Sequence, residues 1–517
     1  MTPTPTQLLL PPSLDRAAAV ELLAERLALE VGRARTEDRV LLDSFDGRLR
    51  AAGLRAERPP GRRDGGVLTV HEPGAPPRRV EVEPARRLLA SELPAGPVRR
   101  RLDDVLEMRA LVPVVRLRSS VLPLGVLNGD AKTVVRLVIE RAEAVADSKR
   151  LPLAPRLAVE PVLGYDDEHA RTLGILRDRL GLEPAGHDLF DEAVMAVGGR
   201  PGGVSSKPRV PLAPGTRAAA AAAAVLSALA GITEANVPGT LADLDTEFLH
   251  DLRVAVRRAR AVLRELDGVH EAGHRAHVRG ELKWIQGLTG PVRDLDVQLL
   301  GWDTLVAPLP PERAAELEPL RGLLQRRRAR ELTRLRRGLR SARFDAALAA
   351  WRELATTEPV HAGPDAAVAI DTVAADRIRR VHRRMVRDGS AIDDDSPPEA
   401  LHDLRKRGKE LRYLLELFGG LFEPKVVKPM VKTLKDLQDV LGSFQDGAVE
   451  SDMLRDLRDE LAAEPGGPAA LIALGPALDA LVAGQQDARD EFADRFAPFA
   501  APEQRALVRD SFPKRSR

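Results

Sequence analysis

The sequence contains no cysteine and few aromatic residues. Phe, Trp and Tyr together make up 3% of its 517 residues. The absence of cysteine excludes disulfide bonds and thiolate metal sites, and it is typical of proteins in a reducing compartment. The low aromatic content argues against a surface that stacks on nucleic acid bases, because base recognition usually depends on aromatic side chains.

Long apolar runs and a secretion signal are also missing. No apolar run reaches the roughly 18 residues that a membrane span needs. Residues 1–12 lack a basic segment followed by an apolar core, so we expect no signal peptide. We therefore predict a cytoplasmic protein without a membrane partner.

Charge is nearly balanced overall, so its distribution is more informative than its total. The chain has 79 basic and 77 acidic residues, which give a formal net charge of +2. Only eleven of the basic residues are lysine, and six of these lie between Lys406 and Lys435. The hydrophobic content of 44% fits a folded globular protein, and the length suggests about two to four domains.

The sequence predicts two structural parts joined by a linker. Residues 1–198 mix strand and helix signals, which favours an α+β domain with an antiparallel sheet or barrel. Residues 199–216 are rich in glycine and proline and predict a linker, whereas 217–500 predict an all-α domain followed by a tail at 501–517. The runs expected as strands are 66–70, 79–83, 114–118 and 134–140, and 166–180 is expected as a helix.

The all-α domain divides into two halves, at about 217–356 and 365–500. Each half holds about four helices, which predicts two related four-helix bundles. Ser396 and Glu399, with two prolines between them, predict a capping box at a helix start in the second half. The expected helices are 217–231, 248–266, 275–305, 312–354, 366–387, 397–418, 424–460 and 470–495.

One pattern occurs twice in the helical region. Residues 249–253 read Leu-His-Asp-Leu-Arg, and the same five residues recur at 401–405, 152 positions further on. An unchanged spacing over several motifs predicts two structural units of similar construction. The same shift relates Arg257 to Lys409, Arg260 to Arg412, Lys283 to Lys435, Gln286 to Gln438, Gly290 to Gly442 and Asp294 to Asp446.

Basic residues in this repeat recur at positions i, i+3, i+7 and i+10, which share one face of a helix. Ten residues of helix extend about 15 Å, so each set forms a stripe of positive charge beside the apolar face. We expect these stripes to line a central groove. The three stripes are His250, Arg253, Arg257 and Arg260; His402, Arg405, Lys409 and Arg412; and Lys425, Lys428, Lys432 and Lys435.

A solvated helix face is the simplest alternative to an anion site. Such faces usually alternate bases and acids four residues apart, but residues 250–264 carry five arginines and one acid. Repulsion between like charges, repeated in both halves, favours anion binding. Nucleic acid is a rival ligand, but the stripes contain almost no aromatics, so a ligand of phosphates alone fits better.

His250 and His402 recur at matching positions near the start of their helices. A shared role towards a phosphate ligand is one interpretation, and packing or capping is the other. Metal binding is not expected, because no second histidine lies one turn away in either helix. Asp294 and Asp446 could orient neighbouring basic side chains or bind a cation that accompanies the anion, and we favour orientation.

The helical region resembles the CHAD domain, the conserved histidine α-helical domain. The segments that carry this resemblance are 248–260, 290–297 and 401–413, and the likeness covers about 217–500. It implies two four-helix bundles related by pseudo-twofold symmetry, with a basic central surface that binds inorganic polyphosphate. One departure is Gln445, which stands where the first half has Arg293.

The stripes and this resemblance together define the ligand-binding residues that we predict. The set combines both halves, and it includes no catalytic residue, no metal ligand and no cofactor. Its members are His250, Arg253, Arg257, Arg260, Lys283, Arg293, His402, Arg405, Lys409, Arg412, Lys428, Lys432 and Lys435.

The first 198 residues resemble the CYTH domain, the triphosphate tunnel fold, at 42–55, 67–70 and 158–164. Such a tunnel uses carboxylates to hold a divalent metal against a triphosphate. The first glutamate of the late Glu-x-Glu motif is replaced by Ala158, and no opening Glu-x-Glu-x-Lys strand is found. We therefore expect a degenerate domain without turnover.

The function that we predict is inorganic polyphosphate binding by a protein that is not an enzyme, with docking on polyphosphate granules as its cellular role. Two alternatives stay open. The first is a triphosphate or polyphosphate hydrolase that acts through the N-terminal domain, although Glu140 and Glu160 alone look insufficient for it. The second is a helical nucleic-acid-binding or scaffold protein.

Overall fold

The computed structural model divides into two compact units, Met1–Ser205 and Ser206–Arg517, each of which is considered by itself. The boundary falls inside the segment expected as a linker. The structure describes residues 6–60, 66–83, 87–146, 149–208, 210–356, 362–393 and 395–513. Parts of the predicted segments 1–198, 199–216 and 501–517 therefore lie outside the described residues.

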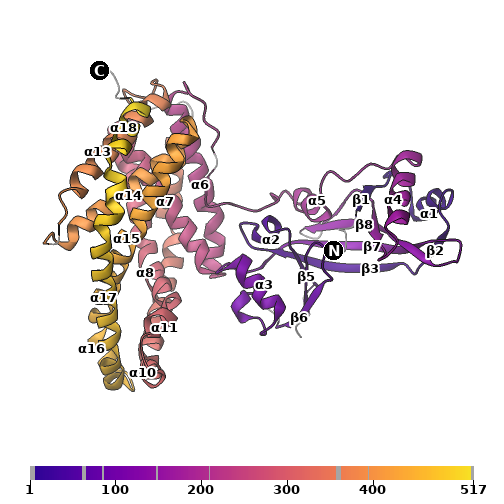
Figure 1. Cartoon of the computed structure of the whole chain (residues 1–517), viewed down its shortest axis with the longest axis horizontal. Helices are drawn as coiled ribbons and strands as arrows, with labels where there is room; N and C mark the ends of the chain where they lie inside the picture. Colours follow the sequence, from indigo (N-terminus) through magenta and orange to yellow (C-terminus); the bar gives the residue numbers. More distant parts are fainter. Residues whose placement is uncertain are drawn as a thin grey trace. The chain divides into compact units, whose positions relative to one another are not determined.

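The N-terminal unit is built on one antiparallel sheet (Figure 1). Its strands follow the order β1-β10-β8-β7-β3-β4-β5-β6, with β2 paired to β7 and β9 paired to β8. The strands are β1 (Thr6–Leu9), β2 (Leu29–Val31), β3 (Arg35–Asp43), β4 (Arg55–Arg58), β5 (Gly66–His71), β6 (Arg78–Val82), β7 (Val112–Leu127), β8 (Thr133–Ala146), β9 (Lys149–Pro152) and β10 (Arg156–Pro161).

All four runs expected as strands lie in strands, namely β5, β6, β7 and β8. Among the described residues β1 and β6 do not pair with each other, so the sheet is open and is not a closed barrel. The helix expected at 166–180 is α4, which continues into a π-helical turn at Ile175–Arg179. The prediction of an antiparallel sheet domain is thus confirmed.

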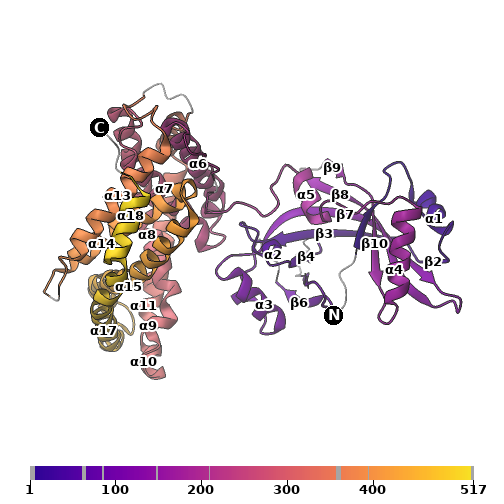
Figure 2. The same cartoon turned by 45° about the horizontal axis from the view of Figure 1, so that its top comes forward.

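Short helices cover this sheet in separate places. Figure 2 shows α5 over strands β7 and β8, and α4 beside β10. Leu122, Leu137 and Leu157 belong to a core that α1 and α4 help to close, whereas Phe190 of α5 packs into another core with Leu117. The helices of the unit are α1 (Arg16–Ala24), α2 (Arg48–Ala51), α3 (Pro97–Leu106), α4 (Asp166–Gly174) and α5 (Leu189–Ala196), with a 3-10 turn at Ala90–Glu92.

The C-terminal unit is helical, as predicted. Helix α6 packs on α7, α7 on α8 and α8 on α11; in the second half, α13 packs on α14, α14 on α15 and α15 on α17. The helices are α6 (Ala218–Ala242), α7 (Thr246–Glu265), α8 (Ala272–Leu300), α9 (Trp302–Val306), α10 (Pro311–Glu316), α11 (Glu318–Leu339), α12 (Ala342–Leu354), α13 (Ile370–Gly389), α14 (Pro398–Phe418), α15 (Pro424–Asp456), α16 (Arg458–Ala462), α17 (Gly467–Ala500) and α18 (Pro502–Ser511).

The two halves of the helical unit touch in several places. Helix α6 contacts α13, α7 contacts α14, and α10 and α11 contact α17 at one end. That end is held together by a core in which Trp302 and Leu320 of the first half meet Leu454 and Leu474 of the second half. The halves are therefore joined by shared packing, and the fold is more than two bundles placed in series.

Several helix boundaries differ from the expected ones. The helix expected at 312–354 is divided into α10, α11 and α12. The tail expected at 501–517 contains α18, whose Val508 is buried, and Phe512 directly after it lies 4.8 Å from Phe422 between ring centroids. The predicted boundaries of these segments were wrong because hydrophobic periodicity predicts the presence of a helix better than the residues at which it begins and ends.

The predicted capping box at the start of α14 is wrong. Pro397 is the N-cap residue, and no side chain caps the helix. The Ser396 hydroxyl donates instead to Asp393, at 2.7 Å, and accepts the Asp393 N–H at 3.0 Å. Proline at the first helical position explains the start without a cap, because proline has no N–H to satisfy.

Two helices contain an 18-residue window that is long and apolar enough to cross a membrane. Of the window in α6, 61% is buried inside the structure, and of the window in α17, 28%. Because the core helix of a globular protein meets the same criterion, this finding by length and composition is weak evidence for a span.

Candidate anion-binding cluster

The histidine lies at the same position in both histidine-bearing helices, although the two helices are capped differently. Helix α7 begins at Thr246, where Asp245 accepts N–H groups of Glu247 and Phe248 at 2.9 and 3.2 Å. His250 is the fifth residue of α7, and His402 is the fifth residue of α14. The duplicated motif therefore occupies the same turn in both helices.

An arginine–glutamine contact is repeated in the two halves. Arg260 of α7 donates to the side-chain oxygen of Gln286 on α8. Arg412 of α14 donates to the side-chain oxygen of Gln438 on α15, at 3.2 Å. The partners are 26 residues apart in each pair, so the sequence repeat is also a repeat in three dimensions.

A second repeated arrangement places an arginine beside a glycine of the neighbouring helix. A Cβ atom added to Gly290 would lie 3.5 Å from the Arg253 guanidinium, and one added to Gly442 would lie 3.7 Å from that of Arg405, which is ordinary van der Waals contact. The two arginines therefore lie at equivalent places against α8 and α15. Arg405 donates to Asp446 at 3.0 Å, which agrees with the orienting role predicted for that carboxylate.

Arg253 is fixed more firmly than its counterpart. It donates to the Gln286 carbonyl oxygen at 2.9 Å and to the Thr289 hydroxyl at 3.0 Å. Burial lowers its pKa, and the nearby charges of Arg257 and Arg293 act in the same direction. Asp294 opposes this effect electrostatically, and its own pKa is raised by burial.

Positive charges from the two halves converge where α7 meets α14. Lys409 of α14 is half-buried beside Arg405 of its own helix and Arg257 of α7. Burial, followed by repulsion from these two arginines, lowers the pKa of Lys409 to about 8, and Asp446 only partly offsets it. This junction therefore holds positive charge that the protein itself neutralises only in part, through Asp446.

Arg257 lies at the centre of this junction. Its Nε atom is buried and has no hydrogen-bond partner among the residues that the structure describes. Buried polar atoms are seldom left without a partner. The Nε atom of its neighbour Arg258 is likewise buried without a hydrogen-bond partner in the described parts of the chain, so the feature reflects close packing between the helices and does not by itself indicate a ligand.

Ion pairs outside the cluster hold the two halves together. Arg258 of α7 pairs with Glu416 of α14 at 2.7 Å, and Arg264 pairs with Glu410 at 2.9 Å. Because these pairs fix α7 against α14, the junction around Arg257 is set by the fold and does not depend on a ligand.

The match between the halves is incomplete. The His402 ring donates from Nδ1 to the side-chain oxygen of Gln445, the residue that replaces arginine in the second half. In the first half, Arg293 lies 3.5 Å from both a Glu247 carboxylate oxygen and the Thr246 carbonyl oxygen. Arg293 and Gln445 therefore have different partners, so the departure noted in the sequence is also a difference in structure between the halves.

The predicted lysines lie at the edge of the cluster. Lys283, Lys428, Lys432 and Lys435 are all exposed, and no ion pair is recorded for them in the described parts of the chain. Lys425, by contrast, pairs with Glu423 at 2.7 Å. Lys435 lies one turn before Gln438 and Lys283 one turn before Gln286, so these two extend the repeated face.

Nine half-buried residues of α7, α8 and α14 form what we call the duplicated basic cluster. The residues are His250, Arg253, Arg257, Arg260, Arg293, His402, Arg405, Lys409 and Arg412.

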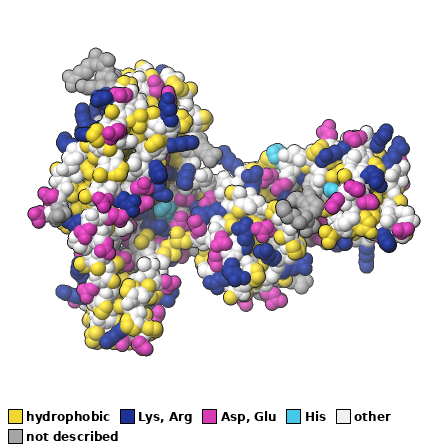
Figure 3. All heavy atoms as spheres, in the orientation of Figure 1, with side chains coloured by type: hydrophobic (Ala, Val, Ile, Leu, Met, Phe, Trp, Pro, Cys, Tyr) yellow, Lys and Arg dark blue, Asp and Glu magenta, His cyan; other side chains and the backbone are white. Residues whose placement is uncertain are grey.

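The outer surface of the helical unit differs from this cluster. Figure 3 shows basic and acidic side chains interspersed over the visible face. Typical pairs there are Arg313 with Glu316 and Arg495 with Glu491, three or four residues apart. In the duplicated basic cluster, Arg293, Arg405 and Arg412 also have acidic partners, Glu247, Asp446 and Glu416, but basic residues outnumber acidic ones along both histidine-bearing helices.

Sequence analysis missed a set of arginines on α11. Arg327, Arg330 and Arg334 line an open cleft that also includes Asp294. Their spacing of three and four residues is the signal that could have revealed them, but no second copy drew attention to it.

The carboxylates of the N-terminal unit are engaged by the protein. Glu140 pairs with Arg39, which also lies 3.5 Å from Glu57. Among the described residues no group of three or more His, Asp or Glu side chains is placed to hold a metal ion. Glu160 lies on β10 opposite Arg136.

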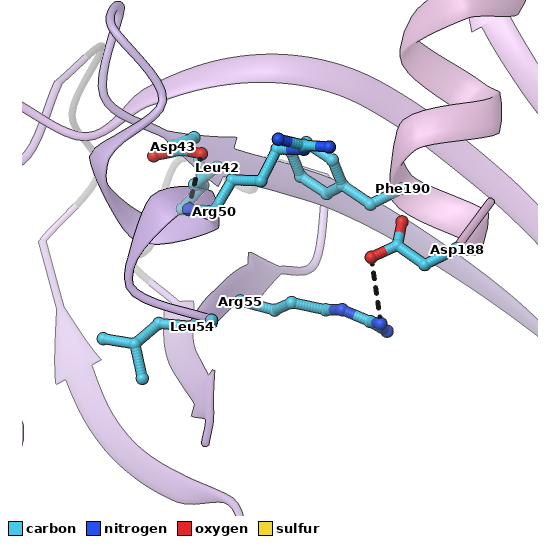
Figure 4. Close-up of a pocket in the computed structure, with 8 residues that line it drawn as sticks. Leu42, Asp43, Arg50, Leu54, Arg55, Asp188 and Phe190 are labelled. Atoms are coloured by element: carbon cyan, nitrogen blue, oxygen red, sulfur yellow. Dashed lines mark hydrogen bonds and ion pairs between the residues drawn. The ribbon is translucent and has the colours of Figure 1, made fainter. Parts of the chain in front are cut away.

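A pocket of about 210 Å³ in this unit is lined by Asp43, Arg50, Asp188 and Phe190 (Figure 4). Asp43 accepts N–H groups of Leu49 and Arg50, and Arg50 makes two bonds of 2.7 Å to Asp191. These groups fix helices α2 and α5, so the pocket has a structural explanation.

Comparison with known proteins agrees with the repeat. Residues 223–455 match the family model of the CHAD domain. The helical unit contains a CHAD domain. This match covers both histidine-bearing helices and most of α15.

Similar proteins share this part of the chain. A curated protein of Mycobacterium tuberculosis strain H37Rv, named as uncharacterized, is 28% identical over 225 residues, which are 43% of this chain and 42% of the relative. Its counterpart in strain CDC 1551 gives the same values. The match thus spans less than half the length of these relatives.

Two solved structures are similar to the CHAD region. The CHAD domain from the plant Ricinus communis has 23% identity and a TM-score of 0.44, and the match covers 58% of this chain and 95% of that structure. PptA from Streptomyces chartreusis has 20% identity and a TM-score of 0.44, with coverage of 54% and 99%.

Proposed function

We propose that this protein binds inorganic polyphosphate through the duplicated basic cluster of its CHAD domain. The observation that carries the proposal is the convergence of Arg257, Arg405 and Lys409 where the two halves meet. Asp446 is the carboxylate that interacts with Arg405 and Lys409, so the three cations outnumber it and gain from a ligand that is itself a chain of anionic oxygens. The twofold repetition suits a linear ligand whose phosphoryl groups are all alike.

Nucleic acid fits this cluster less well. Tyr413 directly follows Arg412 in the sequence, and Trp284 directly follows Lys283. The guanidinium of Arg343 lies 4.4 Å from the ring centre of Trp284, and that of Arg258 lies 5.8 Å from Tyr413. Both rings are therefore in use within the protein, which leaves the cluster without a platform for bases.

A hydrolytic role for the N-terminal unit has no specific support. The pairing of Glu140 with Arg39 keeps that carboxylate occupied, and Ala158 stands where a second metal ligand would be needed. We propose binding without turnover, with polyphosphate granules in the cytoplasm as the site of action. Colocalisation of a fluorescent fusion with these granules tests that part of the proposal.

Charge reversal at one arginine from each half tests the binding site. The full-length Arg253→Glu, Arg405→Glu variant should lose more than about 100-fold in affinity for long-chain polyphosphate, because two contacts become repulsive. Titration calorimetry at fixed salt measures this loss, and circular dichroism checks that the helices persist.

A matched control carries the same change of charge at exposed sites. Arg313 and Arg340 both lie in the first half of the helical unit, are exposed and do not belong to the cluster. The Arg313→Glu, Arg340→Glu variant should therefore lose only a little affinity for polyphosphate. Equal losses in the two double variants would show that net charge, and not the cluster, governs binding. Stronger binding of DNA than of polyphosphate at the same salt would contradict the proposal outright.

A further inference from the structure

An open cleft of about 560 Å³ begins where the duplicated basic cluster ends. Pro291 and Asp294 of α8 form one wall, and Asp294 is the carboxylate that interacts with Arg253. Met453 of α15 forms another wall, seven residues beyond Asp446 and hence on the same face of that helix. The cleft is therefore lined by both halves of the repeat, by the second half about two turns beyond the position equivalent to Asp294.

Helix α11 supplies the basic wall of this cleft. Arg327, Arg330 and Arg334 line it and extend over about 10 Å of helix. Arg330 and Arg334 are exposed, and Arg330 forms no ion pair among the described residues. The cleft thus adds positive charge from a helix outside the duplicated basic cluster.

The other two arginines of this wall are paired to different degrees. Arg334 pairs with Glu331, one turn earlier on the same helix, at 2.5 Å, and its side chain is 71% exposed. An exposed pair of this kind contributes about 0–1 kcal/mol, so a phosphate can replace Glu331 at little cost. Arg327 donates two hydrogen bonds to Glu460 of α16, one of them at 3.1 Å, and is held more firmly.

We propose that a long polyphosphate chain continues from the duplicated basic cluster into this cleft, where Arg330 and Arg334 of α11 hold it. This inference rests on the proposed function and extends it to chain length. A short anion gains more at Arg257 and Lys409, where few carboxylates compete, than in a cleft that also contains Glu331 and Glu460. Only a chain that has filled the cluster has phosphates left for α11.

Removal of two charges tests the inference on the full-length protein. We compare Arg330→Gln with Arg334→Gln against a control, Arg313→Gln with Arg340→Gln, because Arg313 and Arg340 are exposed but do not line the cleft. Each protein is titrated with tripolyphosphate and with size-fractionated long chains at several salt concentrations. The cleft variant should bind tripolyphosphate as the wild type does and long chains more weakly.

The salt dependence supplies a magnitude. Each lost phosphate contact should reduce the slope of log affinity against log salt by about 0.7, so the cleft variant should lose about 1.4 with long chains only. Wild-type affinity of the cleft variant for long chains would overturn the inference, as would an equal loss for both ligands. Failure of the wild type to bind either ligand would instead refute the proposed function.

Discussion

The half-buried lysine at the junction of the two halves makes polyphosphate affinity dependent on pH. The pKa of Lys409 is lowered to about 8 by burial and by the charges of Arg405 and Arg257. As the pH rises through this value the free protein loses the proton, whereas bound phosphate favours the charged form. Binding above pH 8 must therefore take up a proton, and affinity must fall as the pH rises.

The size of this effect follows from the shift. If bound phosphate restores the pKa of Lys409 to its ordinary value of 10.5, affinity should fall about tenfold between about pH 7 and pH 9. Arginine and aspartate side chains do not normally titrate in this range, so Arg257, Arg405 and Asp446, which face Lys409, leave the trend unchanged. Long chains are the appropriate ligand, because only their terminal phosphates titrate near neutrality.

Two variants and a calorimetric experiment test whether Lys409 causes this pH dependence. Lys409→Arg keeps the charge at all of these pH values, so it should bind at pH 7 like the wild type and lose the decline towards pH 9. Lys409→Met should bind more weakly at pH 7 and also show no decline. Calorimetry at pH 8.5 in buffers of different ionisation enthalpy should detect proton uptake by the wild type alone. An unchanged decline in Lys409→Arg would refute the reasoning.

The remaining predictions concern stability. His270 and His382 are buried with pKa values lowered to about 4, so each stays neutral in the folded state while the unfolded state gains a proton near pH 6.5. Each histidine should contribute up to about 3 kcal/mol to the free energy of unfolding above that pH, and this contribution should be lost as the pH falls towards 4. Urea unfolding at several pH values measures the loss. The stability of the His382→Gln variant should depend less on acid pH than that of the wild type. In α6, Gly239→Ala should destabilise the fold by about 1–3 kcal/mol, because the new Cβ would lie 2.1 Å from the ring of Phe248. Gly231→Ala in the same helix meets no atom within 4 Å and should stabilise it by up to about 1 kcal/mol, so equal effects of the two changes would contradict this account.

Most of the fold that the sequence predicted followed from hydrophobic periodicity and from the internal repeat. Strands β5 to β8 and helices α7 and α14 were anticipated because alternation and helical spacing report directly which side chains are buried. The division of 312–354 into three helices, and the helix within the expected tail, were missed because helix ends depend on local packing. The open edges of the sheet were not foreseen either, since closure depends on pairing between distant strands.

The candidate site was predicted in part. The repeat related Arg260 to Arg412 and Gln286 to Gln438, but only the structure shows that each arginine donates to the glutamine 26 residues further on. The arginines of α11 were overlooked, and their relevance depends on Asp294 and Met453, which lie far from them in sequence. The sequence showed that Gln445 stands where the first half has Arg293. The structure adds that these two residues have different partners, so the halves differ at this position.

The sequence by itself determined that two helical units of one design exist and that each carries a basic face, because spacing along a helix fixes which side chains share a side. Only the tertiary structure decided that Arg257 of one unit meets Lys409 of the other, and that α11 adjoins the end of their cluster. Those contacts arise from the packing of α7 against α14 and from the core shared by the two halves. Helical periodicity specifies the face of one helix, but it contains no information about which distant helix will lie opposite.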